Sequence, residues 1–262
     1  MFWRVLRMEL ARACRPSRIV MIILAILLLL FVSDLRLIQW IFQNGYVNHV
    51  GIIEKLGEFF SFDTFKCVFV VLLAGLHANS FCKDDNGKYL RMILSRVDVT
   101  TYTQCRFLAN LLVVLMVAIC SFYGYALMMS PVMPLLHDIR NVIYYYEVAQ
   151  SYPVLYIGMY GYILGIAAAA SSSVGLLLSV YRPNSFVSIG LGGVVFFAVL
   201  SYVPESSLFC VLRIVGMDTT IGYELPWQLM FLWATVYLLA VVGICGVLFY
   251  RRMKWRVENG FL

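Results

Sequence analysis

Long apolar runs separated by short polar segments dominate this chain of 262 residues. Apolar residues make up 62% of the chain and charged residues only 13%, whereas a soluble domain carries about 25% charged residues. So few polar side chains cannot cover a water-facing surface. An apolar helix of about 20 residues is long enough to cross the roughly 30 Å hydrocarbon core of a bilayer. The sequence therefore predicts an all-α integral membrane protein, which we place in the plasma (inner) membrane.

The positions of the basic segments limit how often the chain crosses the membrane. Lys and Arg are concentrated at the amino terminus, in residues 83–106 and at the carboxyl terminus. Cytoplasmic segments of membrane proteins are enriched in these residues. Six spans with both termini in the cytoplasm satisfy all three segments, within one transmembrane domain over residues 1–262. The spans are expected at about residues 19–41, 64–81, 107–129, 154–180, 185–203 and 227–250.

Two further segments are expected to lie along the membrane rather than to cross it. Residues 1–18 place apolar side chains around one side of a helix and arginines on much of the other side, which suits an amphipathic helix at the cytoplasmic surface. The arginines expected to meet lipid headgroups are Arg4, Arg7, Arg12 and Arg15. Residues 204–226 contain an apolar stretch too short to cross, which lies at the interface or dips in and returns before the sixth span.

Other features of the sequence receive structural interpretations. No small-x-small cleavage site follows the first apolar run, so we interpret it as a retained span and not as a signal peptide. Asp34 and Arg36 near its outer end are interpreted as interfacial charges, with a substrate contact as the alternative. The net charge of +6 does not indicate a nucleic-acid partner, because the cations are sorted to the cytoplasmic segments. The 7 cysteines show neither C-x-x-C nor zinc spacing, so we expect no disulfide framework and no metal site.

Catalytic and ion-coupling motifs are missing from the sequence. There is no H-E-x-x-H or G-x-S-x-G motif, and the serines at 171–173 have no neighbouring acid or His. His77, near the cytoplasmic end of the second span, is interpreted as structural. Gly87 and Lys88 lack the rest of a Walker A loop, so the chain is not expected to bind ATP or another cofactor, or to be an enzyme. Ionisable residues do not recur through the middle of the spans, which argues against an ion-coupled carrier.

Small residues recur at every fourth position of the fourth span. They are Gly161, Gly165, Ala169 and Ser173. Such a face lets two helix backbones approach closely in lipid. The pattern serves either packing within one chain or association with another chain.

The loop at residues 83–106 combines charges with apolar residues at helical spacing, between the second and third spans. The stretch NSFCKDDNGKYLRMILSRVDVTTYTQCRFLANLL at residues 79–112, together with the RRMKWRVENG tail, resembles the permease subunits of type-2 ABC exporters. The likeness lies in an acid, then Asn-Gly, a short amphipathic helix, a Ser-Arg turn and a Tyr before the next span. The stretch Gln104-Cys105-Arg106 departs from it, because a lysine is common at the entry to the third span. The six-span layout, with a re-entrant segment before the sixth span, resembles the family over the whole chain.

This resemblance implies that two such permeases pair, identical or related, and that each docks a cytoplasmic ABC ATPase subunit, which binds ATP and Mg²⁺. The exported substrate would be amphiphilic: an antimicrobial or other peptide, a drug or a lipid. The residues expected to serve docking are Asp84, Asp85, Arg91, Met92, Ile93, Leu94 and Arg96. The resemblance also implies that the loop at residues 83–106 forms a cytoplasmic coupling helix between the second and third spans. Asp84 and Asp85 are expected to cap its amino end, and Arg91 and Arg96 to pair with acids of the ATPase. The alternative is that these charges only solvate the loop and set its orientation.

A second hypothesis belongs to another class of function. In it, the chain is a non-transporting scaffold or sensor in the membrane, which holds a partner through the small-residue face of the fourth span. An intramembrane enzyme is a third class, disfavoured by the missing catalytic groups. Purification with a stoichiometric Walker-type ATPase would separate the first hypothesis from the other two.

Overall fold

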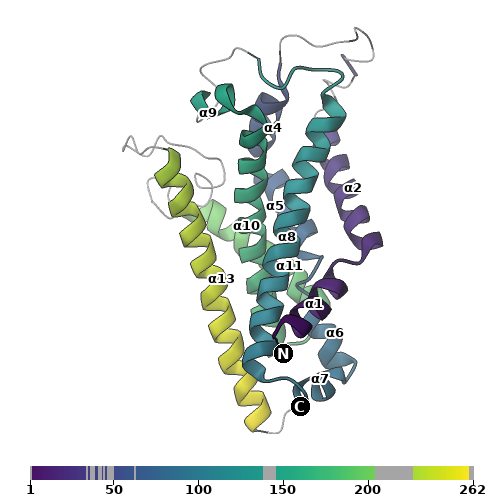
Figure 1. Ribbon diagram of the computed structural model, residues 1–262, viewed down its shortest axis with the longest axis vertical. Helices are drawn as coiled ribbons and strands as arrows, with labels where there is room; N and C mark the ends of the chain where they lie inside the picture. Colours follow the sequence, from purple (N-terminus) through teal and green to yellow (C-terminus); the bar gives the residue numbers. More distant parts are fainter. Residues whose placement is uncertain are drawn as a thin grey trace.

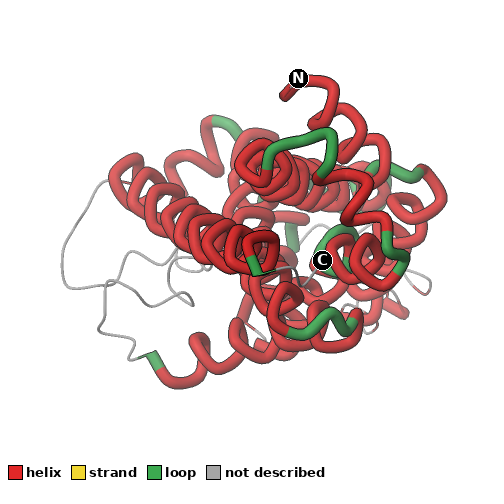
Figure 2. The backbone as a smooth tube through the Cα atoms, turned by 90° about the horizontal axis from the view of Figure 1, so that it is seen from below, coloured by secondary structure: helices red, strands yellow, loops and turns green. Residues whose placement is uncertain are grey.

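The computed structural model describes residues 2–33, 50–61, 63–137, 146–203 and 227–259, together with positions 35, 39, 40, 43 and 45. The regular structure of these residues is entirely helical, and no strand occurs among them (Figure 2). The expected all-α class is therefore confirmed. The predictions for Asp34, Arg36 and the segment at 204–226 fall outside the described residues.

The helices follow the chain with few and short connections. They are α1 (Phe2–Ala13), α2 (Pro16–Ser33), α4 (Ile52–Ser61), α5 (Asp63–Ala74), α6 (Ser80–Asn86), α7 (Tyr89–Leu94), α8 (Val99–Met129), α9 (Tyr146–Ser151), α10 (Pro153–Tyr181), α11 (Ser185–Tyr202) and α13 (Trp227–Glu258). Of these, α8, α10 and α13 are long and apolar enough to cross a membrane. Helices α1 and α2 meet at a bend of 53° and would make a fourth span if counted as one, while α5 and α11 are shorter. The count of six spans stays a prediction.

Helix α10 forms the centre of the molecule (Figure 1). It packs against α8, α13, α11 and α5, while α1 packs across α8. Helices α1, α6 and α7 and the last turns of α13 lie at one end of the bundle, and α4 and α9 lie at the other (Figure 1). The three basic parts of the chain that the sequence assigned to the cytoplasm therefore gather at the same end.

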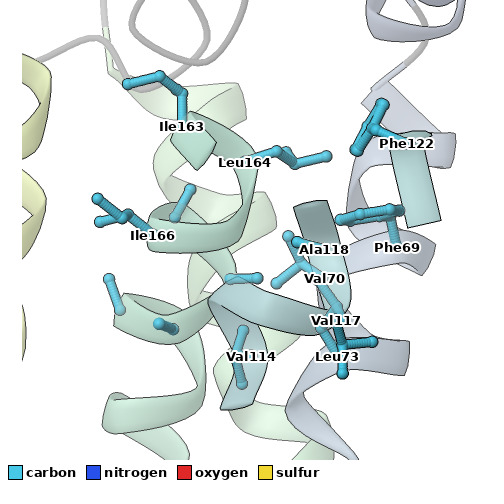
Figure 3. Close-up of a cluster of buried hydrophobic side chains, with 14 of the residues drawn as sticks. Phe69, Val70, Leu73, Val114, Val117, Ala118, Phe122, Ile163, Leu164 and Ile166 are labelled. Atoms are coloured by element: carbon cyan, nitrogen blue, oxygen red, sulfur yellow. The ribbon is translucent and has the colours of Figure 1, made fainter. Parts of the chain in front are cut away.

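The interior of the bundle is packed by apolar side chains of α5, α8 and α10 (Figure 3). The rings of Phe69 and Phe122 lie 5.6 Å apart between α5 and α8, and both are fully buried. Leu164 of α10 points toward the same group (Figure 3). Lipid tails are as apolar as these side chains, so close packing rather than exclusion of water stabilises such an interface.

Two glycines allow α10 to lie directly on α8. A Cβ atom at Gly161 would lie 3.0 Å from the Cα of Ile119, and one at Gly165 would lie 3.0 Å from the Cβ of Ala118. Larger side chains at either position would push the helices apart. The first half of the small-residue face therefore packs inside this chain.

The second half of the face holds a buried polar group of α8. Asn110 Nδ2 donates hydrogen bonds to the carbonyl of Ala169 and to Ser173 Oγ, each at 3.3 Å, and Asn110 Oδ1 accepts one from Ser172 Oγ at 2.7 Å. The amide thus has partners for both of its ends, as a buried polar group requires. The sequence left two uses of this small-residue face open, and in the structure the face packs against another helix of the same chain.

Several helix boundaries differ from the predicted ones. The amphipathic helix predicted for residues 1–18 ends at Ala13, and the first span begins at Pro16 instead of 19. Helix α5 ends at Ala74, and residues 75–79 form an irregular turn where a continuous span to residue 81 was predicted. Helix α8 begins at Val99 instead of 107, and α13 continues to Glu258 instead of 250. The apolar pattern placed the start of α8 too late and the end of α13 too early. The charged turns at these ends remain helical because other parts of the protein pair the charges.

A pair of alanine substitutions in α11 tests how closely this helix approaches α10. A Cβ at Gly192 would lie 2.6 Å from the carbonyl oxygen of Ser171, whereas a Cβ at Gly190 meets nothing within 4 Å. We expect Gly192→Ala to lower the free energy of unfolding by about 1–3 kcal/mol, because α11 must shift. Gly190→Ala should raise it by up to about 1 kcal/mol, because Ala favours the helix. Thermal unfolding in one detergent measures both, and shifts of equal sign would contradict the close approach.

Candidate functional site

A cluster of charges, buried except for Arg12, connects α1, α6 and α8 at the end of the bundle that carries α7. Arg106 of α8 is fully buried, and its Nη2 donates to Asp84 Oδ2 and, at 3.4 Å, to Glu9 Oε1. Arg12 Nη1 donates to both carboxylate oxygens of Asp84 at 3.3 Å. We call Glu9, Arg12, Asp84 and Arg106 the charged cluster. Its two carboxylates balance its two guanidinium groups.

An aromatic ring completes the surroundings of Arg106. The guanidinium lies 4.5 Å from the centre of the Tyr102 ring, and the Tyr102 hydroxyl lies 3.5 Å from Asp84 Oδ2. Removing a charge from water costs several kcal/mol per ion, so a buried guanidinium persists only where opposite charges are fixed around it. The charged cluster therefore stabilises one arrangement of the three helices and disfavours any in which α6 separates from α8.

A second ion pair connects α6 to the last helix. Arg256 Nη2 of α13 donates to the two carboxylate oxygens of Asp85 at 3.1 and 3.2 Å, and each side chain is 14% exposed. Asn86 Nδ2 donates to the carbonyl of Pro183 between α10 and α11 at 3.3 Å. The short helix α6 thus has polar contacts with α1, α8, α13 and the α10–α11 turn.

These contacts correct the expected role of the two acids. Asp84 and Asp85 lie in the last turn of α6, and the residue before α7 is Lys88, with φ of 56° and no side-chain hydrogen bond to cap the helix. The prediction that the acids cap the coupling helix is wrong. Arg106, Arg12 and Arg256 offer them charged partners elsewhere in the fold.

Helix α7 exposes one face and packs the other. Tyr89 is 55% exposed and Met92 58%, while Leu90 is buried. The other predicted docking residues divide in the same way: Arg91 and Arg96 are exposed, and Ile93 and Leu94 are half-buried against the core. Arg91, Met92 and Arg96 are thus available to a partner. Tyr89 joins them, although the sequence analysis did not select it.

The amphipathic character of α1 agrees with the sequence. Its buried residues are Val5, Leu6, Glu9 and Ala13, and they pack on α8. Arg4, Arg7 and Arg15 are exposed, as expected for arginines that meet lipid headgroups. Arg12 differs, because its guanidinium pairs with the carboxylates of the charged cluster.

The turn after α5, outside the long apolar helices, brings His77 next to Glu9. Burial, and after it the nearby cations Arg106, Arg12 and Lys83, together lower the pKa of His77 to about 3. The ring is therefore neutral at pH 7, and the 3.8 Å separation between His77 Nε2 and Glu9 Oε2 is not an ion pair. The expected structural role of His77 agrees with this burial.

Two apolar cavities lie along α13. One of about 420 Å³ lies between α8 and α13 and is lined by residues that include Phe107, Leu111, Val242 and Gly246. A smaller one of about 110 Å³ lies between α10, α11 and α13 and includes Ser171. Both suit a guest that is mostly apolar. Within the described ranges no three metal-binding side chains come together.

The sequence analysis missed four of the side chains that hold α6 in place. They are Glu9, Tyr102, Arg106 and Arg256. Signals in the sequence pointed to two of them: Glu9 is an acid on the apolar face of an amphipathic helix, and Arg106 is an arginine at the start of an apolar run. Comparison of the chain with models of protein families, with curated proteins and with solved structures finds no match.

Proposed function

We propose that this chain is the membrane-spanning permease subunit of an ATP-driven exporter of the type-2 ABC kind, and that a separate cytoplasmic ATPase moves it through α7. One observation carries the proposal: α7 exposes Tyr89, Arg91 and Met92, while the adjoining α6 is ion-paired to α1, α8 and α13. The exposed face of α7 is suited to receive a push, and the ion pairs of the adjoining α6 are suited to distribute it to three helices.

The proposed topology has six spans, α2, α5, α8, α10, α11 and α13, with both termini in the cytoplasm. Helices α1, α6 and α7 and the end of α13 gather at one end of the bundle (Figure 1), which supports one shared aqueous side for them. Exposed cations at this end, among them Arg4, Arg7, Arg15 and Arg91, favour the cytoplasmic side.

Transport requires a path and a source of energy. The apolar cavities beside α13 support a substrate with a large apolar part, such as a peptide, a drug or a lipid. A second permease, identical or related, would complete the path. The energy would come from ATP and Mg²⁺ bound by the ATPase.

The scaffold hypothesis is less well supported, because α8 of the same chain covers the small-residue face of α10 through which the scaffold would hold its partner.

Purification from native cells in mild detergent tests the proposal directly. A Walker-type ATPase in stoichiometric amount is the expected result, and its absence in several detergents would contradict the proposal.

A charge reversal on α7 tests the docking surface. We expect Arg91→Glu to reduce the amount of ATPase that copurifies by about tenfold, because an exposed cation facing an acidic partner surface becomes repulsive. Arg7→Glu is the matched control, since it reverses an exposed charge on α1 and should leave copurification unchanged. Quantitative immunoblotting of equal amounts of membrane-inserted protein measures the effect. Equal loss in both variants would remove Arg91 from the docking surface.

A further inference from the structure

A third cavity, of about 220 Å³, lies between the α1–α2 bend, the turn after α5 and α6. Its charged lining residues are Arg12, Arg15, Arg18, Lys83, Arg106, Glu9 and Asp84. Five cations and two carboxylates leave an excess of three positive charges around one small space. A water molecule needs only about 10–15 Å³, so the cavity has room for a phosphate group and its hydration.

Several buried donors in this cavity have no hydrogen-bond partner among the described residues. They are His77 Nε2, Arg106 Nε and Nη1, and Ser80 Oγ. His77 is 2% exposed and Arg106 is fully buried, so their donors are cut off from bulk water. Leaving such donors unsatisfied is costly, which points to an acceptor that is present when the protein is in its membrane. Glu9 Oε1 and Asp84 already accept hydrogen bonds from Arg12 and Arg106. Glu9 Oε2 has no hydrogen-bond partner among the described residues, but it lies 3.8 Å from His77 Nε2, beyond hydrogen-bond distance.

The cations of the cavity also act on one another. Burial lowers the pKa of Lys83, and the positive charges of Arg18 and Arg15 lower it further. An anion among these side chains would relieve this repulsion. The excess of positive charge and the donors without partners therefore both favour an anionic ligand that accepts hydrogen bonds.

We propose that this cavity binds the phosphate group of an anionic phospholipid. The cavity opens beside the amphipathic helix α1 and the start of α2, where Met21 and Val20 are exposed and apolar. Basic pockets between membrane helices on the cytoplasmic side are suited to acidic headgroups. The acyl chains would lie along α2 while the phosphate accepts hydrogen bonds from His77, Arg106 and the lysine and arginines around it. This inference does not depend on the exporter proposal, because it concerns only lipid and this chain.

The test uses the purified full-length chain in detergent, titrated with short-chain phosphatidylglycerol and, separately, with short-chain phosphatidylcholine and inorganic phosphate. We expect phosphatidylglycerol to bind at least about tenfold more tightly than phosphatidylcholine, as a net anion in a basic pocket should. The double variant Arg15→Gln with Arg18→Gln should bind phosphatidylglycerol at least about tenfold more weakly than the original chain. The control is Arg4→Gln with Arg7→Gln, which removes two exposed charges from α1 outside the cavity. It should weaken the binding of phosphatidylglycerol by less than about threefold.

Each alternative outcome is distinct. Equal weakening by the two double variants would mean general attraction to the basic surface and would overturn the proposal. Inorganic phosphate that binds as tightly as phosphatidylglycerol would assign the cavity to the free ion and overturn the lipid assignment. If Arg15→Gln with Arg18→Gln does not fold, Lys83→Gln at the exposed rim replaces it, and unchanged binding in that variant would also overturn the proposal.

Discussion

Replacing Arg106 by methionine is expected to lower the free energy of unfolding by about 3–5 kcal/mol, the cost of breaking a buried ion pair. The substitution leaves the carboxylates of Glu9 and Asp84 without the guanidinium that is shared between them. Methionine retains much of the side-chain length, so lost charge and not lost volume dominates. Thermal and denaturant unfolding in one detergent measure the change.

Two variants separate this effect from a general loss of charge. Arg96→Met removes an exposed cation from the same loop and should change stability by less than about 0.5 kcal/mol. Combining Arg106→Met with Asp84→Asn should cost about 0.5–3 kcal/mol less than the sum of the two single effects, because the neutral amide no longer needs a cation. If Arg106→Met is no more destabilising than Arg96→Met, the charged cluster does not hold α6 to α8.

The helices whose boundaries the sequence predicts well are those with sharp local signals. The predicted spans 154–180 and 185–203 correspond to α10 (Pro153–Tyr181) and α11 (Ser185–Tyr202). Pro153 opens the first, and Asn184 caps the second by accepting a hydrogen bond from the Phe186 amide. In α8 and α13 the helix continues through charged turns, so an apolar window misplaces one end of each.

The charged links of α6 were not predictable in the same way. Asp84 pairs with Arg106 and Arg12, and Asp85 pairs with Arg256, which is 171 positions away along the chain. Sequence reasoning assigned both acids to the nearest helix end because capping is a local rule. The partners of a buried acid depend on how helices pack, and helical periodicity does not specify this. The exposed face of α7 was predicted only in part, since the expected contact residues Ile93 and Leu94 are half-buried against the core and the exposed Tyr89 was not selected.

Reversing the charge of Asp85 is expected to release α6 from α13. Asp85→Arg places two cations where a carboxylate and a guanidinium are 3.1 Å apart and each side chain is only 14% exposed. A hydrogen bond between charged groups contributes about 1.5–3 kcal/mol. Amide hydrogen exchange in α6 and α7 should therefore accelerate by about tenfold or more, while the amides of α10 keep their rates. In the exporter that we propose, this variant would still bind the ATPase through α7 but would no longer transmit its movement to α13.

Exchanging the two charges provides the decisive comparison. Asp85→Arg combined with Arg256→Asp restores opposite charges across the same gap, and we expect exchange in α6 and α7 to return to within about threefold of the original rate. Lys254→Ala is the matched control on α13, because Lys254 and Glu258 form a pair that is more than half exposed and contributes little. Slow exchange in the Asp85→Arg variant would show that α6 is held without α13. Fast exchange in the variant with exchanged charges would show that packing around Asp85, and not its charge, joins the two helices.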